Sequence, residues 1–116
     1  TKAINNEKII IEGDGLQARD FTFIDDTINV LINIIENRDT YHRYLNIGTG
    51  KDASIIDIYK ILKDFFKNLK VEHVDKRPNE VKTFIADNTI IRQEFEFNPI
   101  VDLKDGIKKV IDFYLK

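Results

Sequence analysis

The sequence predicts an α/β fold in which a small mixed sheet is covered by helices. Three segments place apolar residues at the spacing of a helix face, and short β-branched or aromatic runs lie between them. The expected order is β, β, α, β, α, β, β, α, α, and such mixing is typical of α/β domains. No repeat or linker divides the chain, so residues 1–116 are expected to form one domain. The expected strands are residues 8–12, 19–24, 43–47, 70–75 and 82–86.

The helices are predicted from apolar spacing and from capping residues at their first turns. Residues 26–38 carry apolar side chains on one face, which we expect to be buried. A second helix starts at Ser54, where Asp57 completes a capping box, and a third opens at Asp102. A shorter helix is expected after Asp87. The apolar faces consist of Ile28, Leu31, Ile32 and Ile35 in the first helix, Ile55, Ile58, Tyr59, Leu62, Phe65 and Phe66 in the second, and Leu103, Ile107, Val110, Ile111 and Tyr114 in the third.

Composition narrows the classes of function. The chain is 42% hydrophobic and 33% charged, with a net charge of −2 whose positive and negative residues are interspersed, so a nucleic-acid partner is not expected. No apolar run approaches the ~20 residues that span a bilayer, and no signal-peptide pattern opens the chain, so a cytoplasmic protein is expected. Without cysteine, and with His42 and His73 far apart, no metal site is expected.

Three short motifs resemble cofactor or catalytic signatures but have simpler explanations. GDGLQA, residues 13–18, fits G-x-G-x-x-A, yet a dinucleotide site needs a helix next, and the following RDFTFI alternates like a strand; a turn is therefore predicted. NIGTGKDAS, residues 46–54, lacks P-loop spacing and has Asp52 in place of the hydroxyl that would hold Mg²⁺. It is expected to be a loop that presents main-chain amides. Tyr59 and Lys63 match Y-x-x-x-K, but Tyr59 belongs to an apolar helix face and is expected to pack there.

The sequence Arg77-Pro78-Asn79-Glu80 predicts a β-turn, because proline fixes φ and asparagine tolerates the left-handed region. Such a turn brings Arg77 and Glu80 together. Two interpretations remain open: a surface ion pair, or a guanidinium for phosphate beside an acceptor for sugar hydroxyls. Arg19 adds a second cation, and Phe21 is expected beside it on the same strand face, either supporting a base or sugar ring or packing in the core.

Four blocks carry a family resemblance. They are GDGLQARDFTFIDDTINVL, YLNIGTGKDASIIDIYKIL, RPNEVKTFIAD and NPIVDLKDGIKKVIDFYL, and together they cover nearly the whole chain. In this order they resemble the C-terminal substrate-binding half of the extended short-chain dehydrogenases. These are the NAD-dependent nucleotide-sugar epimerases and dehydratases, of which UDP-glucose 4-epimerase is the best-known type.

The resemblance implies a set of nucleotide-sugar-binding residues. Arg19 and Arg77 match arginines that contact the diphosphate, and Glu80 matches the acidic residue that reaches the ribose. Phe21 matches an aromatic position near the nucleotide, and Asn46 matches an asparagine near the diphosphate in related dehydratases.

The resemblance also implies that the other half of such an enzyme is absent from the chain. No segment matches the Rossmann domain that would bind NAD and supply the catalytic Tyr-x-x-x-Lys, and Tyr59 and Lys63 follow the glycine loop and do not correspond to that pair. We therefore expect a fragment of a larger enzyme, with no catalytic or cofactor residue of its own and no activity alone. The lack of methionine fits this expectation, or removal of an initiator before Thr1. Its expected partners are a nucleotide sugar and the Rossmann domain, whose uncovered interface would favour self-association.

The sequence predicts the type of reaction less closely than it predicts the family. R-P-N-E resembles the acidic form found in 4-epimerases, whereas thymidine-type dehydratases more often have histidine there, so epimerisation is the leading prediction. Dehydration at C4 and C6, decarboxylation, a stand-alone nucleotide-binding module and a purely structural domain remain alternatives. The nucleotide and the sugar cannot be read from these residues.

Overall fold

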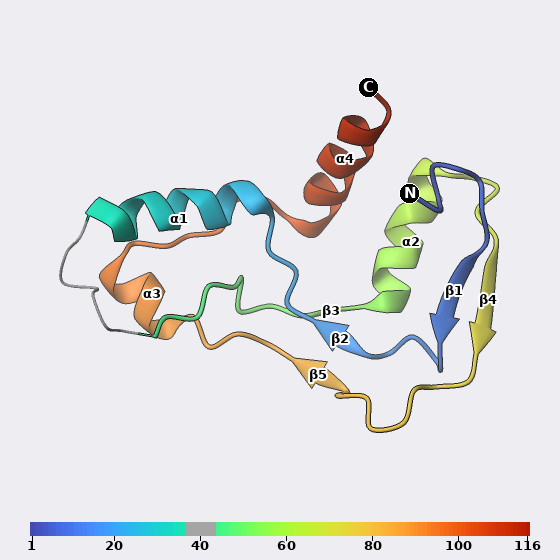
Figure 1. Ribbon diagram of the computed structural model, residues 1–116, viewed down its shortest axis with the longest axis horizontal. Helices are drawn as coiled ribbons and strands as arrows, with labels where there is room; N and C mark the ends of the chain where they lie inside the picture. The colour runs from blue at the N-terminus through green and yellow to red at the C-terminus, as the bar shows by residue number, and fades with distance from the viewer. Residues whose placement is uncertain (37–43) are drawn as a thin grey trace.

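The computed structural model of the protein describes residues 1–36 and 44–116. Within these residues the elements follow the predicted order and form a small mixed α/β fold (Figure 1). They are β1 (Ile9–Glu12), β2 (Ala18–Arg19), α1 (Ile24–Glu36), β3 (Ala53–Ser54), α2 (Ile55–Phe65), β4 (Val71–Val74), β5 (Thr83–Phe84), α3 (Thr89–Glu94) and α4 (Leu103–Tyr114).

The strands form two small sheets, where the sequence predicts one. β1 pairs in parallel with β4, with Ile9 opposite Val71. β2 lies at the centre of a second sheet, antiparallel to β3 and parallel to β5. The division follows from the turn between β1 and β2. Gly13 and Gly15 adopt φ values of +66° and +75°, which glycine reaches without steric cost, and the chain changes direction there.

The predicted strand at 19–24 is wrong over most of its length. β2 ends at Arg19 and α1 begins at Ile24. Asp20 explains the early end: its carboxylate accepts hydrogen bonds from the backbone of Thr49 and Gly50, so the chain turns toward the glycine loop instead of extending the ladder. Alternation over so few residues does not require pairing, because a strand needs a partner along its whole length.

The predicted strand at 43–47 is also not found. Residues 44–47 form no strand, and residue 43 lies outside the described residues. The third strand instead lies at Ala53–Ser54, immediately before α2, where Ala53 is opposite Arg19.

The predicted helix starts are confirmed for α2 and α4. The Ser54 hydroxyl accepts from the Asp57 amide at 3.1 Å while the Asp57 carboxylate accepts from the Ser54 amide at 3.2 Å, which completes a capping box. Asp102 caps α4 by accepting from the Asp105 amide at 2.9 Å. The short helix predicted after Asp87 is α3. The end of the first predicted helix, residues 37–38, lies outside the described residues.

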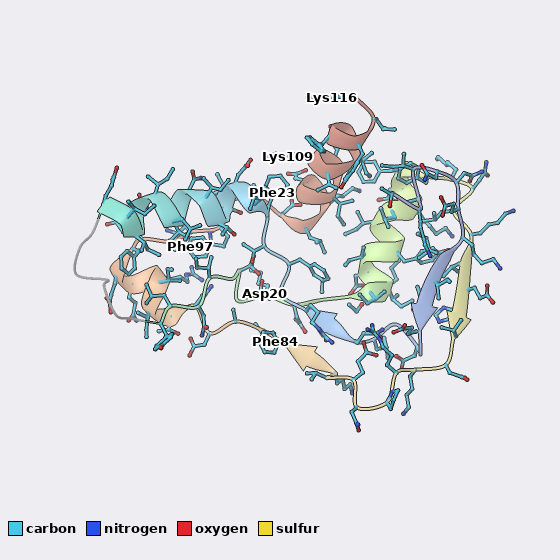
Figure 2. All side chains as sticks on the ribbon, viewed as in Figure 1. Asp20, Phe23, Phe84, Phe97, Lys109 and Lys116 are labelled. Atoms are coloured by element: carbon cyan, nitrogen blue, oxygen red, sulfur yellow. The ribbon has the colours of Figure 1, made fainter. Side chains whose placement is uncertain are left out.

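The face of α1 that the sequence predicts to be buried is in fact exposed. Val30 is 1% exposed and packs in a core with Ile91, Phe95 and Phe97; Figure 2 marks Phe97 between α1 and α3. The predicted face is left uncovered because the core lies on the opposite side of the helix. Its members are Ile28, Leu31, Ile32 and Ile35, between 43% and 74% exposed.

Asp26 ties the first turn of α1 to the chain that precedes α4. It is 3% exposed and accepts from the amides of Ile100 and Val101 at 3.1 and 3.2 Å. A buried carboxylate needs such donors, so this residue fixes where the two helices meet.

The molecule is flat and open. Its principal extents are 49 × 38 × 17 Å and its radius of gyration is 16.7 Å, against about 13 Å for a compact domain of this length. Among the residues that the structure describes, two apolar surfaces remain uncovered: the outer face of α1, and a groove between α2 and α4. None of the helices among residues 1–36 and 44–116 is long and apolar enough to cross a membrane.

Candidate functional site

The turn after β4 has the geometry that its sequence predicts. Pro78 and Asn79 occupy the turn, and Asn79 adopts φ +59° in the left-handed region. The reversal places the Arg77 Nη2 atom 3.5 Å from the Glu80 Oε1 atom. The predicted proximity of Arg77 and Glu80 is therefore confirmed.

A second arginine reaches the same carboxylate from β2. The Arg19 Nη2 atom lies 3.9 Å from Glu80 Oε1, and its Nη1 donates to the Ala18 carbonyl at 2.7 Å. Arg77 also pairs through Nε with Glu12 at the end of β1. The result is an alternating chain of charges, Glu12, Arg77, Glu80 and Arg19, which joins the ends of β1 and β2 to the turn after β4. The Glu80 side chain, 17% exposed, lies between the two guanidinium groups.

Glu12, Arg77 and Glu80 line a hollow of about 360 Å³, here called the arginine hollow, and Arg19 is joined to it through its contact with Glu80. Its size falls in the range of small-ligand sites. The Arg77 side chain is 67% exposed, so N–H donors that Glu12 and Glu80 leave unused face solvent. Charges of both signs line the hollow, from Lys76, Arg77 and Lys82 and from Glu12, Asp14 and Glu80.

The alternating pattern predicts that Phe21 lies beside Arg19 on one strand face, but the structure does not place it there. Because β2 ends at Arg19, Phe21 borders a different hollow of about 370 Å³ that it shares with Thr49, Lys51 and residues 99–103. It is 37% exposed. Phe21 therefore does not belong to the arginine cluster.

Asn46 is also placed apart from the arginines. Its side-chain amide donates to the Asp87 carbonyl at 3.4 Å, and it does not line the arginine hollow. Of the five predicted site residues, the structure brings together Arg19, Arg77 and Glu80.

Asp20 is one residue that the sequence reasoning missed. Its carboxylate lies at the centre of the molecule (Figure 2) and accepts from the Thr49 hydroxyl at 2.6 Å, from the Thr49 and Gly50 amides at 2.9 Å, and from the Ala86 amide at 3.4 Å. Burial opposes ionisation of Asp20, but these hydrogen bonds outweigh it and hold its pKa below the usual value.

The main-chain amides of the glycine loop bind the Asp20 carboxylate. The amides of Thr49 and Gly50 are occupied by Asp20, so in this structure they do not face a phosphate. An aspartate directly after a short strand, in a chain whose glycine loop has unassigned amides, is the signal from which Asp20 could have been found.

The turn at residues 13–18 and the packing of Tyr59 agree with the prediction from the sequence. Residues 13–16 turn between β1 and β2, and the Asp14 carboxylate accepts from the Leu16 amide at 2.9 Å. Tyr59 is half-buried on α2, with the Lys63 ammonium 5.8 Å from its ring centre. His73 contacts the Gly13 carbonyl through Nδ1 at 2.8 Å, and His42 lies outside the described residues.

Residues 1–110 match the sequence model of the GDP-mannose 4,6 dehydratase family. The chain belongs to this family. Its relatives are NAD-dependent nucleotide-sugar epimerases and dehydratases, so the resemblance in the four blocks is confirmed. One is a UDP-glucuronate 4-epimerase of Thermodesulfobacterium geofontis, which is 33% identical over 115 residues covering 97% of the chain and 35% of the relative.

Solved structures support the fold. A UDP-glucuronic acid 4-epimerase from Bacillus cereus, in complex with UDP-glucuronic acid and NAD, has a TM-score of 0.83 at 30% identity over 92% of the chain and 35% of its own. The UDP-glucose 4-epimerase of Thermotoga maritima, solved with UDP-glucose, superimposes with a TM-score of 0.88 over 97% of this chain and 36% of its own. Its sequence identity is 24%, so this similarity supports the fold alone. The chain thus spans about a third of the length of the relatives it matches.

Proposed function

We propose that this chain is the diphosphate- and ribose-binding portion of an NAD-dependent nucleotide-sugar 4-epimerase. The observation that carries the proposal is the convergence of Arg19 and Arg77 on Glu80, which together with Arg77 lines the arginine hollow. Both arginines contact this one carboxylate, and the Arg77 side chain is 67% exposed, so its guanidinium group is open to an anionic ligand. Guanidinium N–H groups match phosphate oxygens in pairs, and a carboxylate accepts from a ribose diol.

In this proposal the three side chains bind and position the substrate, and none takes part in bond breaking. Arg19 and Arg77 hold the diphosphate and Glu80 holds the ribose, so that the sugar is presented to a nicotinamide in another part of the polypeptide. Positioning of this kind supplies a large share of catalytic rate enhancements. Phe21 and Asn46 remain predictions from the family resemblance, placed outside the arginine cluster.

NAD would be bound by a Rossmann domain of the same polypeptide. The Bacillus cereus relative was crystallised with NAD and a UDP-sugar, and about two thirds of its length has no counterpart in this chain. NAD accepts a hydride from a sugar carbon in such chemistry. The residues of this chain hold the other end of the substrate, which is why they carry no information about stereochemistry at the reacting carbon.

The chain alone is expected to bind a nucleotide sugar weakly. Two arginine–phosphate contacts of about 1.5–3 kcal/mol each give about 3–6 kcal/mol, against an association cost of at least about 4 kcal/mol. Because both arginines must also exchange their carboxylate partners for phosphate, a dissociation constant of about 1 mM or weaker is expected.

A 4,6-dehydratase is the second candidate, favoured by the description of the family that residues 1–110 match. Product analysis by mass spectrometry and chromatography separates the two. The polypeptide in its natural full length is incubated with NAD and UDP-glucose, and in parallel with NAD and a dTDP- or GDP-sugar. A 4-epimerase returns UDP-galactose of unchanged mass, and a dehydratase returns a product that has lost one water. Recovery of unaltered substrate from UDP-, dTDP- and GDP-sugars alike would contradict both.

A further inference from the structure

The first seven residues have the hydrogen bonds of a helix end, although the first regular element of the fold, β1, begins only at Ile9. The Asn5 amide donates to the Thr1 carbonyl at 3.0 Å, which is the spacing of an α-helical turn. The Glu7 amide donates to the Lys2 carbonyl at 2.9 Å and the Asn6 amide to the Ala3 carbonyl at 3.2 Å. Asn6 has φ +57°. These two nested bonds around a left-handed residue constitute a Schellman motif, a common C-terminal cap of α-helices.

A single turn does not account for such a cap. Nucleating a helix is costly, and one isolated turn in water is unstable, so a Schellman motif is expected where several turns precede it. Ala3 is 8% exposed, whereas Lys2 and Asn5 are exposed, so the turn already has a buried and a solvent side. The chain spans 35% of the length of two relatives that it matches.

The same turn borders an apolar groove of about 470 Å³, here called the N-terminal groove. The N-terminus lies beside the end of α2, and α4 stands on the other side of the groove (Figure 1). Of the described residues that line it, only Lys2 and Asp102 have charged side chains. Val110 and Tyr114 of α4, which line it, are 48% and 56% exposed. Uncovered apolar surface of this kind marks a contact with another segment.

We propose that the N-terminal groove is filled by a helix formed by the residues immediately before Thr1 in the same polypeptide, of which Thr1–Asn5 are the last turn. This inference does not depend on the proposed activity. Continuing the buried side of Ala3 and Ile4 at helical spacing places apolar residues at the first and second positions before Thr1, and again at the fourth and fifth. The helix would cover the apolar residues of α4 and fix the angle between α4 and α2.

The test uses the natural full-length protein with cysteine pairs and a bismaleimide cross-linker. In both variants one cysteine replaces the second residue before Thr1. In the test pair the other cysteine is Val110→Cys in the groove. In the control pair it is Lys108→Cys on the same helix. The Lys108 side chain is 57% exposed and pairs with Asp112, away from the groove, and residues 1–116 contain no cysteine to interfere. We expect cross-linking with Val110→Cys and little with Lys108→Cys. Equal yields for the two pairs would overturn the proposal.

A second measurement needs no substitution. Hydrogen exchange of the full-length protein should show the residues before Thr1 protected at least about tenfold over an unstructured chain, together with the amides of Asn5 to Glu7. Exchange at the unstructured rate, or a reading frame that starts at Thr1, would overturn the proposal even where cross-linking is observed.

Discussion

Replacing Asp20 with asparagine should loosen the glycine loop without changing the size of the side chain. In the native structure each carboxylate oxygen has donors of its own. Oδ1 receives both the amide and the hydroxyl of Thr49, and Oδ2 receives the amides of Gly50 and Ala86. An asparagine that keeps an oxygen toward Thr49 turns its NH₂ group toward Gly50 and Ala86, so donors face donors.

The magnitude follows from the bonds that are lost. The Gly50 bond is short at 2.9 Å, and hydrogen bonds to charged groups contribute about 1.5–3 kcal/mol. The Ala86 bond is long at 3.4 Å and adds less. A local destabilisation of about 2–4 kcal/mol is therefore expected, which corresponds to about 30- to 900-fold faster opening of the loop.

Amide hydrogen exchange at Gly50 in the full-length protein measures this opening directly. The matched control is Asp112→Asn on α4, which removes an exposed ion pair with Lys108 and should change exchange of its neighbours by less than about fivefold. If Gly50 in Asp20→Asn exchanged within about threefold of the wild-type rate, the central role assigned to Asp20 would be refuted.

The same residue predicts a pH dependence. The pKa of Asp20 in the folded protein is lower than the 3.8 of an unperturbed aspartate, because burial, which opposes ionisation, is outweighed by the hydrogen bonds to its carboxylate. The unfolded state therefore binds the proton first as pH falls. The stabilisation is fully present above about pH 4 and is lost as pH drops through the folded pKa. Carbon-13 NMR titration of the Asp20 carboxyl should give a midpoint below 3.8, and a midpoint at or above that value would contradict the hydrogen-bond account.

Two further predictions concern elements that position the site. Ser54→Ala removes the capping box shared with Asp57 and should destabilise α2 by about 1 kcal/mol, measured as faster amide hydrogen exchange in its first turn. Ser54→Thr is the control that retains the hydroxyl. Equal effects of the two substitutions would refute the role of capping. Gly15→Ala adds a methyl group 2.7 Å from Ile56 at a residue with φ +75°, and should lower the urea midpoint by more than Gly13→Ala, where the nearest atom lies 3.1 Å away at φ +66°. The difference, about 1–3 kcal/mol, reports the close packing of Gly15 against Ile56 of α2 and Ile11 of β1. Equal midpoints would show that the contact is relieved at no cost.

Helices are more predictable than strands in this chain, because their signals are local. Ser54 and Asp57 mark the start of α2 within four residues, and both halves of the capping box form as expected. Strand pairing depends on partners far away in sequence. Nothing in RDFTFI shows that Asp20 will turn toward a loop about thirty residues later, and its alternation predicts a strand although only Ala18–Arg19 pairs.

The buried side of α1 could not be predicted, since both sides are apolar. Val30 and Ile34 face the core, while Ile28 and Leu31 lie on the exposed side. Periodicity identifies an apolar face but not what covers it, and in this chain that face has no covering segment among the described residues.

The candidate site was predictable where its geometry is set by a turn. Pro78 and Asn79 fix the approach of Arg77 to Glu80. The contribution of Arg19 was reached through charge and family resemblance, because its position depends on β2 pairing with β5. Glu12 was not anticipated at all. Its contact with Arg77 arises from the parallel pairing of β1 and β4, which joins segments about sixty residues apart.

The most direct test of the diphosphate site is isothermal titration of UDP into the natural full-length protein and its Arg77→Ala variant, with Arg92→Ala as control. Arg92 lies on α3 and pairs with Asn98, away from the arginine hollow. Loss of one arginine–phosphate contact of about 1.5–3 kcal/mol should raise the dissociation constant about 10- to 150-fold in Arg77→Ala and leave it unchanged in Arg92→Ala. Binding of UDP by Arg77→Ala within about twofold of the unmodified protein would contradict the assignment of this cluster to the diphosphate.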